Sequence, residues 1–330
     1  MYRANSDRYD KMQYIRCGQS GLLLPRLALG LWQNFGQEQD YSKAKNMVCG
    51  AFDLGITYFD LANNYGPPAG SAEKTFGAIL KEELAAYRDE MVIATKASYH
   101  MWTGPYGSGG SKKHIMASLD QSLQRMGLDY VDIFYSHRYD ENTPLEETME
   151  TLAEVVRQGK ALYVGISNYK ADQTKKAVRI LHQLGVHCLI HQPSYSMFNR
   201  WIEEELLDVL EERGIGCAVY SPLAQGLLST KYLGGIPASS RAGRGLTSLN
   251  PEQITPQKLQ QVRQLNEIAQ TRGQSLSQMA LAWVLREDRV QTAIIGASSL
   301  IQIEENVEAL QNLYFTRSET VQINDILSGR

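Results

Sequence analysis

The chain has 330 residues, 43% of them hydrophobic and 21% charged, and its formal net charge is −3. This composition is typical of a globular protein with a large core and excludes a disordered chain, and the lack of a positive field argues against nucleic acid as a partner. The polar extension over residues 1–13 has no apolar stretch that could serve as a signal peptide or span a membrane. We therefore expect a cytoplasmic protein without a membrane partner that acts on small molecules.

The predicted elements begin with a hairpin over residues 14–24, whose turn is Gly18-Gln19-Ser20-Gly21. We expect it to cap one end of the main fold. Eight short runs that are apolar on both faces follow, a pattern that favours parallel strands covered by helices. These runs are 27–31, 56–60, 91–96, 130–137, 161–167, 187–192, 216–220 and 292–296.

Helical segments separate the strands. They are predicted over 43–54, 72–83, 112–126, 145–158, 170–184, 201–213, 256–286 and 300–312. Glycines stand where several helices should stop, as left-handed C-caps require: Gly55, Gly127, Gly159, Gly185, Gly214 and Gly273. Thr143-Pro144 with Glu146, and Thr255-Pro256, predict N-caps followed by proline at the first helical position.

Strands and helices that alternate along the whole length predict right-handed βαβ units, and eight of them close most simply into a (β/α)8 TIM barrel. We expect one domain over 1–330, with the hairpin at the barrel bottom and a long loop over residues 223–254. The competing fold is an open, doubly wound sheet. That fold usually has a glycine-rich turn after its first strand when it binds dinucleotides, and residues 29–34 (LGLWQN) do not provide one.

Three consecutive predicted strands end in Asp60, Lys96 and His137, and Tyr65 lies five residues beyond Asp60. The carboxyl ends of barrel strands meet at one place, so these side chains should converge. Each alone has a plain structural explanation, such as a helix cap, a surface aromatic or a core histidine. Lys96 ends an apolar run and needs a partner where it is desolvated, which Asp60 can supply. Together the four residues form a proton-transfer set.

The residue types indicate a reaction. An ammonium near a phenol favours the phenolate, so we expect Lys96, held by Asp60, to make Tyr65 a better proton donor. His137 can donate a hydrogen bond to an oxygen that gains negative charge. This arrangement suits a carbonyl group that receives a hydride, and because no side chain donates hydride, a cofactor must.

Later strand ends carry groups that suit such a cofactor. Ser167-Asn168, Gln192 and Tyr220-Ser221 offer amides, hydroxyls and an aromatic face for a nicotinamide, although each is also a plausible loop start. The glycine-containing loop that follows, with Lys231 and Arg241, has the character of a pyrophosphate site or of a mobile surface loop. Gly296-Ala297-Ser298 then opens a helix that bears Gln302, Glu305 and Asn306, and a helix start is a ready phosphate site. The four cysteines lie far apart in sequence, and we expect no metal.

At this point the chain resembles the aldo-keto reductase superfamily, from the hairpin to Asn306, with Asp60, Tyr65, Lys96 and His137 matching its catalytic tetrad. Trp32, residues 136–138 (SHR), 220–228 (YSPLAQGLL) and 295–298 (IGAS) are similar to the branch that contains potassium-channel β-subunits. Residues 63–68 (NNYGPP), 104–111 (GPYGSGGS) and 190–195 (IHQPSY) are similar to bacterial glyceraldehyde 3-phosphate reductases.

The resemblance implies a reductase that binds NADPH extended across the barrel mouth, with residues 223–254 as a loop that covers the cofactor. Ser167, Asn168 and Gln192 would hold the carboxamide and Tyr220 would stack on the ring. The further residues that it implies for the cofactor are Trp32, Ser221, Leu223, Gln225, Gly226, Lys231, Arg241, Gly296, Ser298, Gln302, Glu305 and Asn306. Many family members have Lys-Ser and then Arg at the adenosine-phosphate site, where this chain has Ala297-Ser298 and Gln302, so it offers fewer cations for choosing NADPH over NADH.

A ring of side chains could form the substrate pocket: Trp32, Tyr99, Trp102, Tyr106, Arg138 and Tyr195. Arg138 could attract an anionic aldehyde such as L-glyceraldehyde 3-phosphate, whereas methylglyoxal would be an uncharged one; a cofactor or salt-bridge role for Arg138 is the alternative. Channel β-subunits motivate a second function, an NADPH-sensing regulatory subunit with incidental turnover. Relatives that are tetramers imply a homo-oligomer by analogy.

Overall fold

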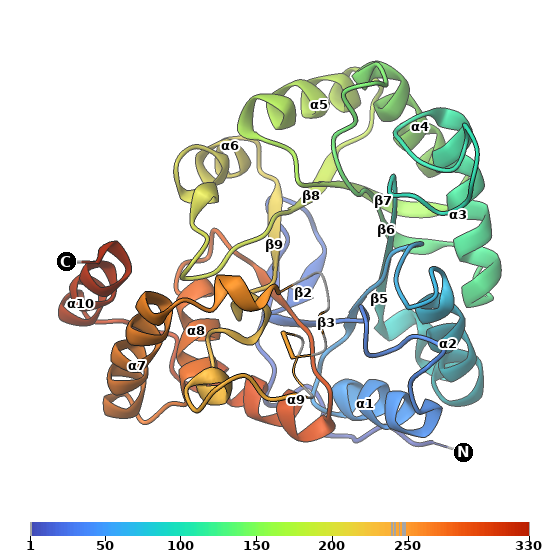
Figure 1. The fold of residues 1–330 in the computed structure, drawn as a ribbon. Coiled ribbons are helices and arrows are strands. Elements are labelled where there is room, and N and C mark those ends of the chain that lie inside the picture. Colours follow the sequence, from blue (N-terminus) through green and yellow to red (C-terminus); the bar gives the residue numbers. More distant parts are fainter. Residues whose placement is uncertain (1, 239, 241, 244, 246–248, 330) are drawn as a thin grey trace.

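A computed structural model describes residues 2–238, 240, 242–243, 245 and 249–329 of the chain. Eight parallel strands form a closed barrel in the order β10-β3-β4-β5-β6-β7-β8-β9, with helices around it (Figure 1). The predicted (β/α)8 barrel is therefore confirmed. The strands are β3 (Leu27–Gly30), β4 (Tyr58–Asp60), β5 (Val92–Ala97), β6 (Val131–Ser136), β7 (Ala161–Ser167), β8 (Cys188–Gln192), β9 (Gly216–Tyr220) and β10 (Thr292–Ile295).

The predicted hairpin is also present, as strands β1 (Tyr14–Arg16) and β2 (Leu23–Pro25), which pair antiparallel. Its turn lies against the start of β9: the Gln19 backbone N–H donates to the Gly214 carbonyl over 2.9 Å. A Cβ atom on Gly216 would come within 2.3 Å of the Cys17 sulfur, so any larger residue there would displace the buried Cys17 side chain. The hairpin thus covers the amino end of the barrel, opposite the strand ends that carry Asp60 and Lys96.

The helices broadly match the predicted segments. They are α1 (Tyr41–Asp53), α2 (Ser71–Ile79), α3 (Lys112–Met126), α4 (Leu145–Arg157), α5 (Ala171–Gln183), α6 (Leu206–Glu212), α7 (Pro256–Thr271), α8 (Leu276–Val284), α9 (Leu300–Val307) and α10 (Arg317–Ser328). The segment predicted as one helix over 256–286 is two, because Gly273 takes a left-handed φ of 69° between α7 and α8. A π-helical turn, Leu80–Leu84, continues α2, and 3₁₀ turns flank α6 and α9.

The two predicted N-caps have different outcomes. Thr255 caps α7, and its side chain accepts the Lys258 N–H, with Pro256 at the first helical position. At α4 the prediction was wrong: Pro144 itself is the N-cap residue, with no side-chain cap. The Thr143 hydroxyl instead donates to Asp140 Oδ2 over 2.7 Å, because Asp140 organises this loop through several hydrogen bonds.

The packing of the barrel interior explains why the Asp60 side chain points inward. Tyr58 and Tyr135 are fully buried, and their hydroxyl groups lie 2.7 Å apart. Alternate strand residues share a face, so a strand that turns Tyr58 into the interior also turns Asp60 inward. Phe59 and Phe134 belong instead to the larger apolar cluster that joins strands and helices.

Among the residues that the structure describes, no helix has the length and apolar character needed to cross a membrane. Within the same residues, no group of three or more His, Cys, Asp and Glu side chains is arranged to hold a metal ion.

Candidate active site

Lys96 lies at the centre of the candidate site, fully buried at the carboxyl end of β5. Its Nζ donates to Asp60 Oδ2 over 2.6 Å, to the Leu61 carbonyl over 2.6 Å and to the Tyr65 hydroxyl over 3.4 Å. Three acceptors use the three ammonium donors, which compensates for burial of the charge. The predicted convergence of Asp60, Tyr65 and Lys96 is therefore found.

His137 completes the group immediately after β6, where its backbone N–H donates to the Ala97 carbonyl over 2.9 Å. Its ring lies edge-on to Tyr65, with centroids 6.0 Å apart and planes at 71°. Nδ1 is buried without a hydrogen-bond partner among the described residues. A polar ring atom beside a phenol and an ammonium suits the binding of a polar ligand.

The pKa of Tyr65 is raised well above its ordinary value, mainly because the phenol is buried and also because the Asp60 carboxylate lies near. The expected lowering by Lys96 is therefore corrected: burial outweighs an ammonium that Asp60 already neutralises. Burial also lowers the pKa of Lys96, which Asp60 opposes. Tyr65 consequently keeps its proton at neutral pH and can release it only to a strongly basic atom.

The pKa of His137 is lowered well below its ordinary value, first by burial and then by the positive charges of Lys96 and Arg138. The imidazole is therefore neutral at pH 7 and has one N–H to donate. A neutral donor beside Tyr65 can stabilise an oxygen that becomes negative without releasing its own proton first.

The groups predicted to hold a nicotinamide are connected to one another. The Tyr220 hydroxyl donates to Asn168 Oδ1 over 2.8 Å, and Asn168 Nδ2 donates to the His137 carbonyl over 3.0 Å. The Ser167 hydroxyl donates to the Gln192 carbonyl over 2.7 Å. Amides, a hydroxyl and an aromatic ring next to His137 fit the chemistry of a carboxamide-bearing ring.

Backbone strain is concentrated at the same end of the barrel. Left-handed φ angles are unfavourable for residues other than glycine and cluster at functional sites. Among the described residues, those with such angles all follow the carboxyl end of a barrel strand: Gln33, Ser98, Asn168, Ser221, Ala224 and Gln225. The chain adopts these unfavourable conformations at the end that carries Asp60, Lys96 and His137.

The remaining predicted cofactor residues lie in the segments that follow β9 and β10 and in α9. Leu223, Gln225 and Gly226 are half-buried, Lys231, Gly296, Ser298, Gln302 and Glu305 are exposed, and Asn306 is buried. Gln302 Oε1 accepts from both the backbone N–H, over 2.8 Å, and the hydroxyl of Ser298, over 3.1 Å. Gln225 Nε2 donates to the Ser221 hydroxyl over 2.8 Å. Arg241 lies outside the described residues.

Several predicted substrate residues surround His137 and Tyr65. The Tyr99 ring stands edge-on to His137 with centroids 4.6 Å apart, and the Arg138 guanidinium lies 5.2 Å from the Tyr99 ring. The Trp32 ring is 6.4 Å from that of Tyr65. No carboxylate of the described part of the chain lies within ion-pair distance of Arg138.

Trp102 and Tyr106 belong to the loop between β5 and α3. The Trp102 ring packs on buried His114, with centroids 5.0 Å apart, and His114 Nδ1 lies 3.0 Å from the Tyr106 carbonyl. Since a carbonyl only accepts, that nitrogen carries the hydrogen. The Tyr106 side chain itself is exposed.

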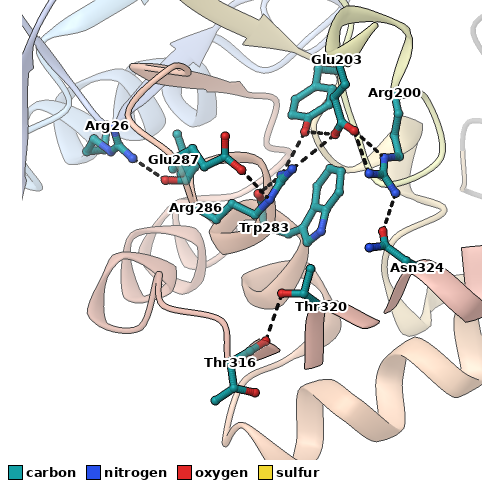
Figure 2. Close-up of polar contacts among 11 residues, drawn as sticks. Arg26, Arg200, Glu203, Trp283, Arg286, Glu287, Thr316, Thr320 and Asn324 are labelled. Atoms are coloured by element: carbon teal, nitrogen blue, oxygen red, sulfur yellow. Dashed lines mark hydrogen bonds and ion pairs between the residues drawn. The ribbon is translucent and has the colours of Figure 1, made fainter. Parts of the chain in front are cut away.

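The prediction that Tyr195 lines the substrate pocket is corrected. Tyr195 is buried, its hydroxyl donates to Glu203 over 2.5 Å and accepts from Arg286 over 2.9 Å, and its ring packs on Trp283. Figure 2 shows Glu203 between Arg200 and Arg286 in this network. The Tyr195 hydroxyl is therefore hydrogen-bonded within the protein and is not free to contact a substrate.

Two cavities at the surface do not coincide with the candidate site. The larger, of about 450 Å³, lies between α7 and α10, and the second, of about 380 Å³, lies beside the hairpin and α8. Neither is lined by Asp60, Tyr65, Lys96 or His137. Side-chain chemistry, rather than the size of a hollow, therefore locates the site.

One contact was not predicted from the sequence. Gln192 Nε2 donates to Asp60 Oδ1 over 2.8 Å, and both side chains are buried. The sequence did show that Gln192 ends β8 and that its side chain should face the barrel interior. It could not show the contact with Asp60, because Asp60 is in β4, which is not a neighbour of β8 in the barrel.

Comparison with known proteins gives a consistent assignment. Residues 26–328 match the model of the aldo/keto reductase family. The chain is 57% identical over 328 residues to L-glyceraldehyde 3-phosphate reductase of Escherichia coli K12, covering 98% of this chain and 95% of that protein. It is 39% identical over 301 residues to a Schizosaccharomyces pombe protein named "Putative voltage-gated potassium channel subunit beta", covering 89% and 87% of the two chains. The chain therefore belongs to the aldo/keto reductase family and is an oxidoreductase.

Proposed function

We propose that this protein reduces the carbonyl group of small aldehydes with NADPH, and that Tyr65 supplies the proton. The observation that carries the proposal is the position of Lys96 Nζ, which contacts both the Asp60 carboxylate and the Tyr65 hydroxyl inside the barrel. The Tyr65 hydroxyl holds its proton firmly, and the neutral His137 imidazole lies beside it. Such a pair can protonate a substrate carbonyl oxygen at the moment when that oxygen gains negative charge.

When bound, a reduced nicotinamide would supply the hydride for the carbonyl carbon, and the residues of this chain would manage the proton. Tyr65 holds its proton because burial raises its pKa, and it releases that proton to the carbonyl oxygen as negative charge develops there. The Lys96 ammonium, fixed by Asp60, stabilises the phenolate that remains. His137 donates a second hydrogen bond to the same oxygen, which its neutral imidazole can do without changing charge.

NADPH would be held by the connected groups at the ends of β7, β8 and β9. Ser167, Asn168 and Gln192 would bind the carboxamide and Tyr220 would stack on the ring. The phosphates would be held by Lys231, Arg241, Ser298 and Gln302, and the adenine would lie by Glu305 and Asn306. We expect NADPH to bind more tightly than NADH, which a titration of intrinsic fluorescence with each cofactor measures directly.

The environment of Arg138 is evidence that the substrate is an anion. Its guanidinium stacks on Tyr99 beside His137, with no carboxylate of the described residues within ion-pair distance. Such a cation can bind a phosphate through charge-assisted hydrogen bonds. The name of the E. coli relatives points to L-glyceraldehyde 3-phosphate, so we propose it as the substrate, ahead of methylglyoxal.

The test is the loss of reduced-nicotinamide absorbance with L-glyceraldehyde 3-phosphate, L-glyceraldehyde and methylglyoxal. In Arg138→Ala, kcat/KM for the phosphorylated aldehyde should fall about 10- to 100-fold while the value for L-glyceraldehyde changes little. Arg157→Ala, which removes the same charge from the end of α4, is the control and should behave like wild type. An unchanged ratio in Arg138→Ala excludes phosphate recognition by Arg138.

Absence of turnover with every aldehyde, combined with tight NADPH binding and co-purification with a membrane protein, would overturn the reductase proposal. That combination is the result expected of an NADPH-sensing regulatory subunit. By analogy with tetrameric relatives we propose a homo-oligomer, which light scattering after size-exclusion chromatography measures.

A further inference from the structure

Gln192 makes a contact that binding a cofactor carboxamide does not require. Its Nε2 donates to Asp60 Oδ1 over 2.8 Å, while Lys96 Nζ occupies Asp60 Oδ2 over 2.6 Å. The orientation of the amide is fixed by chemistry, because an ionised carboxylate only accepts hydrogen bonds and the amide nitrogen must face it. Each Asp60 oxygen therefore has one buried donor.

The rest of the Gln192 side chain is equally constrained. Gln192 is 1% exposed and lies beside the Tyr135 hydroxyl, which in turn is 2.7 Å from the Tyr58 hydroxyl. Its backbone carbonyl accepts from the Ser167 hydroxyl. With the amide nitrogen committed to Asp60, the amide oxygen Oε1 is the atom that can accept an N–H from a ligand.

We propose that Gln192 is a positioning residue that joins the cofactor site to the catalytic carboxylate: its amide nitrogen fixes Asp60, and its amide oxygen receives the carboxamide. The inference rests on the proposed function and deepens it. Asp60 orients Lys96, and Lys96 contacts the Tyr65 hydroxyl, so the amide acts on the proton donor through three consecutive hydrogen bonds. Loss of such positioning lowers a rate strongly without removing any reacting group.

The first variant, Gln192→Met, keeps the side-chain volume and removes the donor. Asp60 Oδ1 then lacks a partner, so we expect kcat to fall about 100-fold at every pH. The second variant, Gln192→Glu, is the sharper probe because it places two carboxyl groups against each other. At low pH the two share a proton, and the resulting O–H···O hydrogen bond substitutes for the amide.

Raising the pH removes that shared proton, so kcat of Gln192→Glu should begin near the wild-type value and then fall about 100-fold along a new descending limb. The charged and titratable groups that face this position are Asp60 from β4, Lys96 from β5, Tyr135 from β6 and, behind it, Tyr58. None of them gives the wild-type protein a pair of adjacent carboxylates, so the limb belongs to the variant alone.

Gln270→Glu is the matched control, because it makes the same change of side chain at an exposed position in α7, outside the candidate site. It should leave both the kcat profile and NADPH binding, measured by fluorescence titration, unchanged. Thermal unfolding of each variant verifies that it is folded.

A Gln192→Glu profile parallel to that of wild type, or a Gln192→Met variant that retains kcat and only binds NADPH more weakly, overturns this inference. Wild-type protein that reduces no aldehyde refutes the proposed function itself. The two failures are therefore distinguishable in one set of measurements.

Discussion

Lys96 and Asp60 form a buried ion pair, with Nζ 2.6 Å from Oδ2 and the lysine side chain fully shielded from solvent. Two charges are stable in the barrel interior only because each satisfies the other and because Gln192 and the Leu61 carbonyl supply further hydrogen bonds. The proposed chemistry at Tyr65 depends on this pair.

Tyr65→Phe removes the proposed proton donor and leaves the ring in place. We expect kcat for aldehyde reduction to fall by about 10²- to 10⁴-fold, with the Kd for NADPH nearly unchanged. Tyr314→Phe, which removes a hydroxyl from an exposed side chain, is the control. A kcat within tenfold of wild type in Tyr65→Phe would show that another group supplies the proton.

Lys96→Met leaves Asp60 charged and unpaired in the interior, so the free energy of unfolding should fall by about 3–5 kcal/mol in urea denaturation. The double variant Asp60→Asn with Lys96→Met removes both charges and should recover most of that loss while remaining inactive. If the two substitutions were simply additive, the pair would not be the stabilising interaction described here.

His191 predicts a pH dependence of stability. It is buried beside the Tyr169 carbonyl, and burial lowers its pKa to about 4. The unfolded chain binds a proton below about pH 6.5 and the folded chain does not, so this contribution is complete above pH 6.5 and is lost as the pH falls toward 4. His191→Gln keeps an N–H for Tyr169 and should show about 3 kcal/mol less destabilisation over that interval, measured by urea unfolding. Identical pH dependence in the two proteins would contradict a neutral buried imidazole.

Ala224→Gly should stabilise the protein, because Ala224 has a left-handed φ of 48° that glycine adopts without strain. We expect a gain of about 1 kcal/mol in the free energy of unfolding. Ala85→Gly, at an exposed position with right-handed helical angles, should lose about 1 kcal/mol. Changes of the same sign in both variants would rule out backbone strain at Ala224.

The barrel was predictable because each strand is an apolar run of limited length, and several helices end at a glycine. The β7 and β9 boundaries agree with the predicted spans at both ends. Helix α10 was missed, although Thr316 and Glu319 form a capping box and Gly329 is a left-handed C-cap. Its link to the barrel is long-range: Arg200 donates to Asn324 over 2.7 Å, as Figure 2 shows, and no local pattern encodes such a contact.

The site was predictable where chemistry depends on strand order and not where it depends on side-chain direction. Asp60, Lys96 and His137 end consecutive strands, so their convergence follows from the topology. Tyr195 follows β8 closely, yet its side chain turns toward Glu203 and Arg286, because both form hydrogen bonds with its hydroxyl. The predicted lowering of the Tyr65 pKa was wrong, because the sequence does not reveal how deeply the phenol is buried.

The two ends of the barrel differ in how their chain reversals are built. Glycines such as Gly55, Gly159 and Gly185 turn the chain back into strands at the amino end, whereas at the carboxyl end non-glycine residues such as Asn168 and Ser221 hold left-handed positions as well as glycines. A glycine turn is free of strain but carries no side chain, whereas a strained non-glycine turn presents a side chain at the mouth of the barrel. Selection can therefore reshape substrate preference at the mouth while the opposite end keeps the protein able to fold.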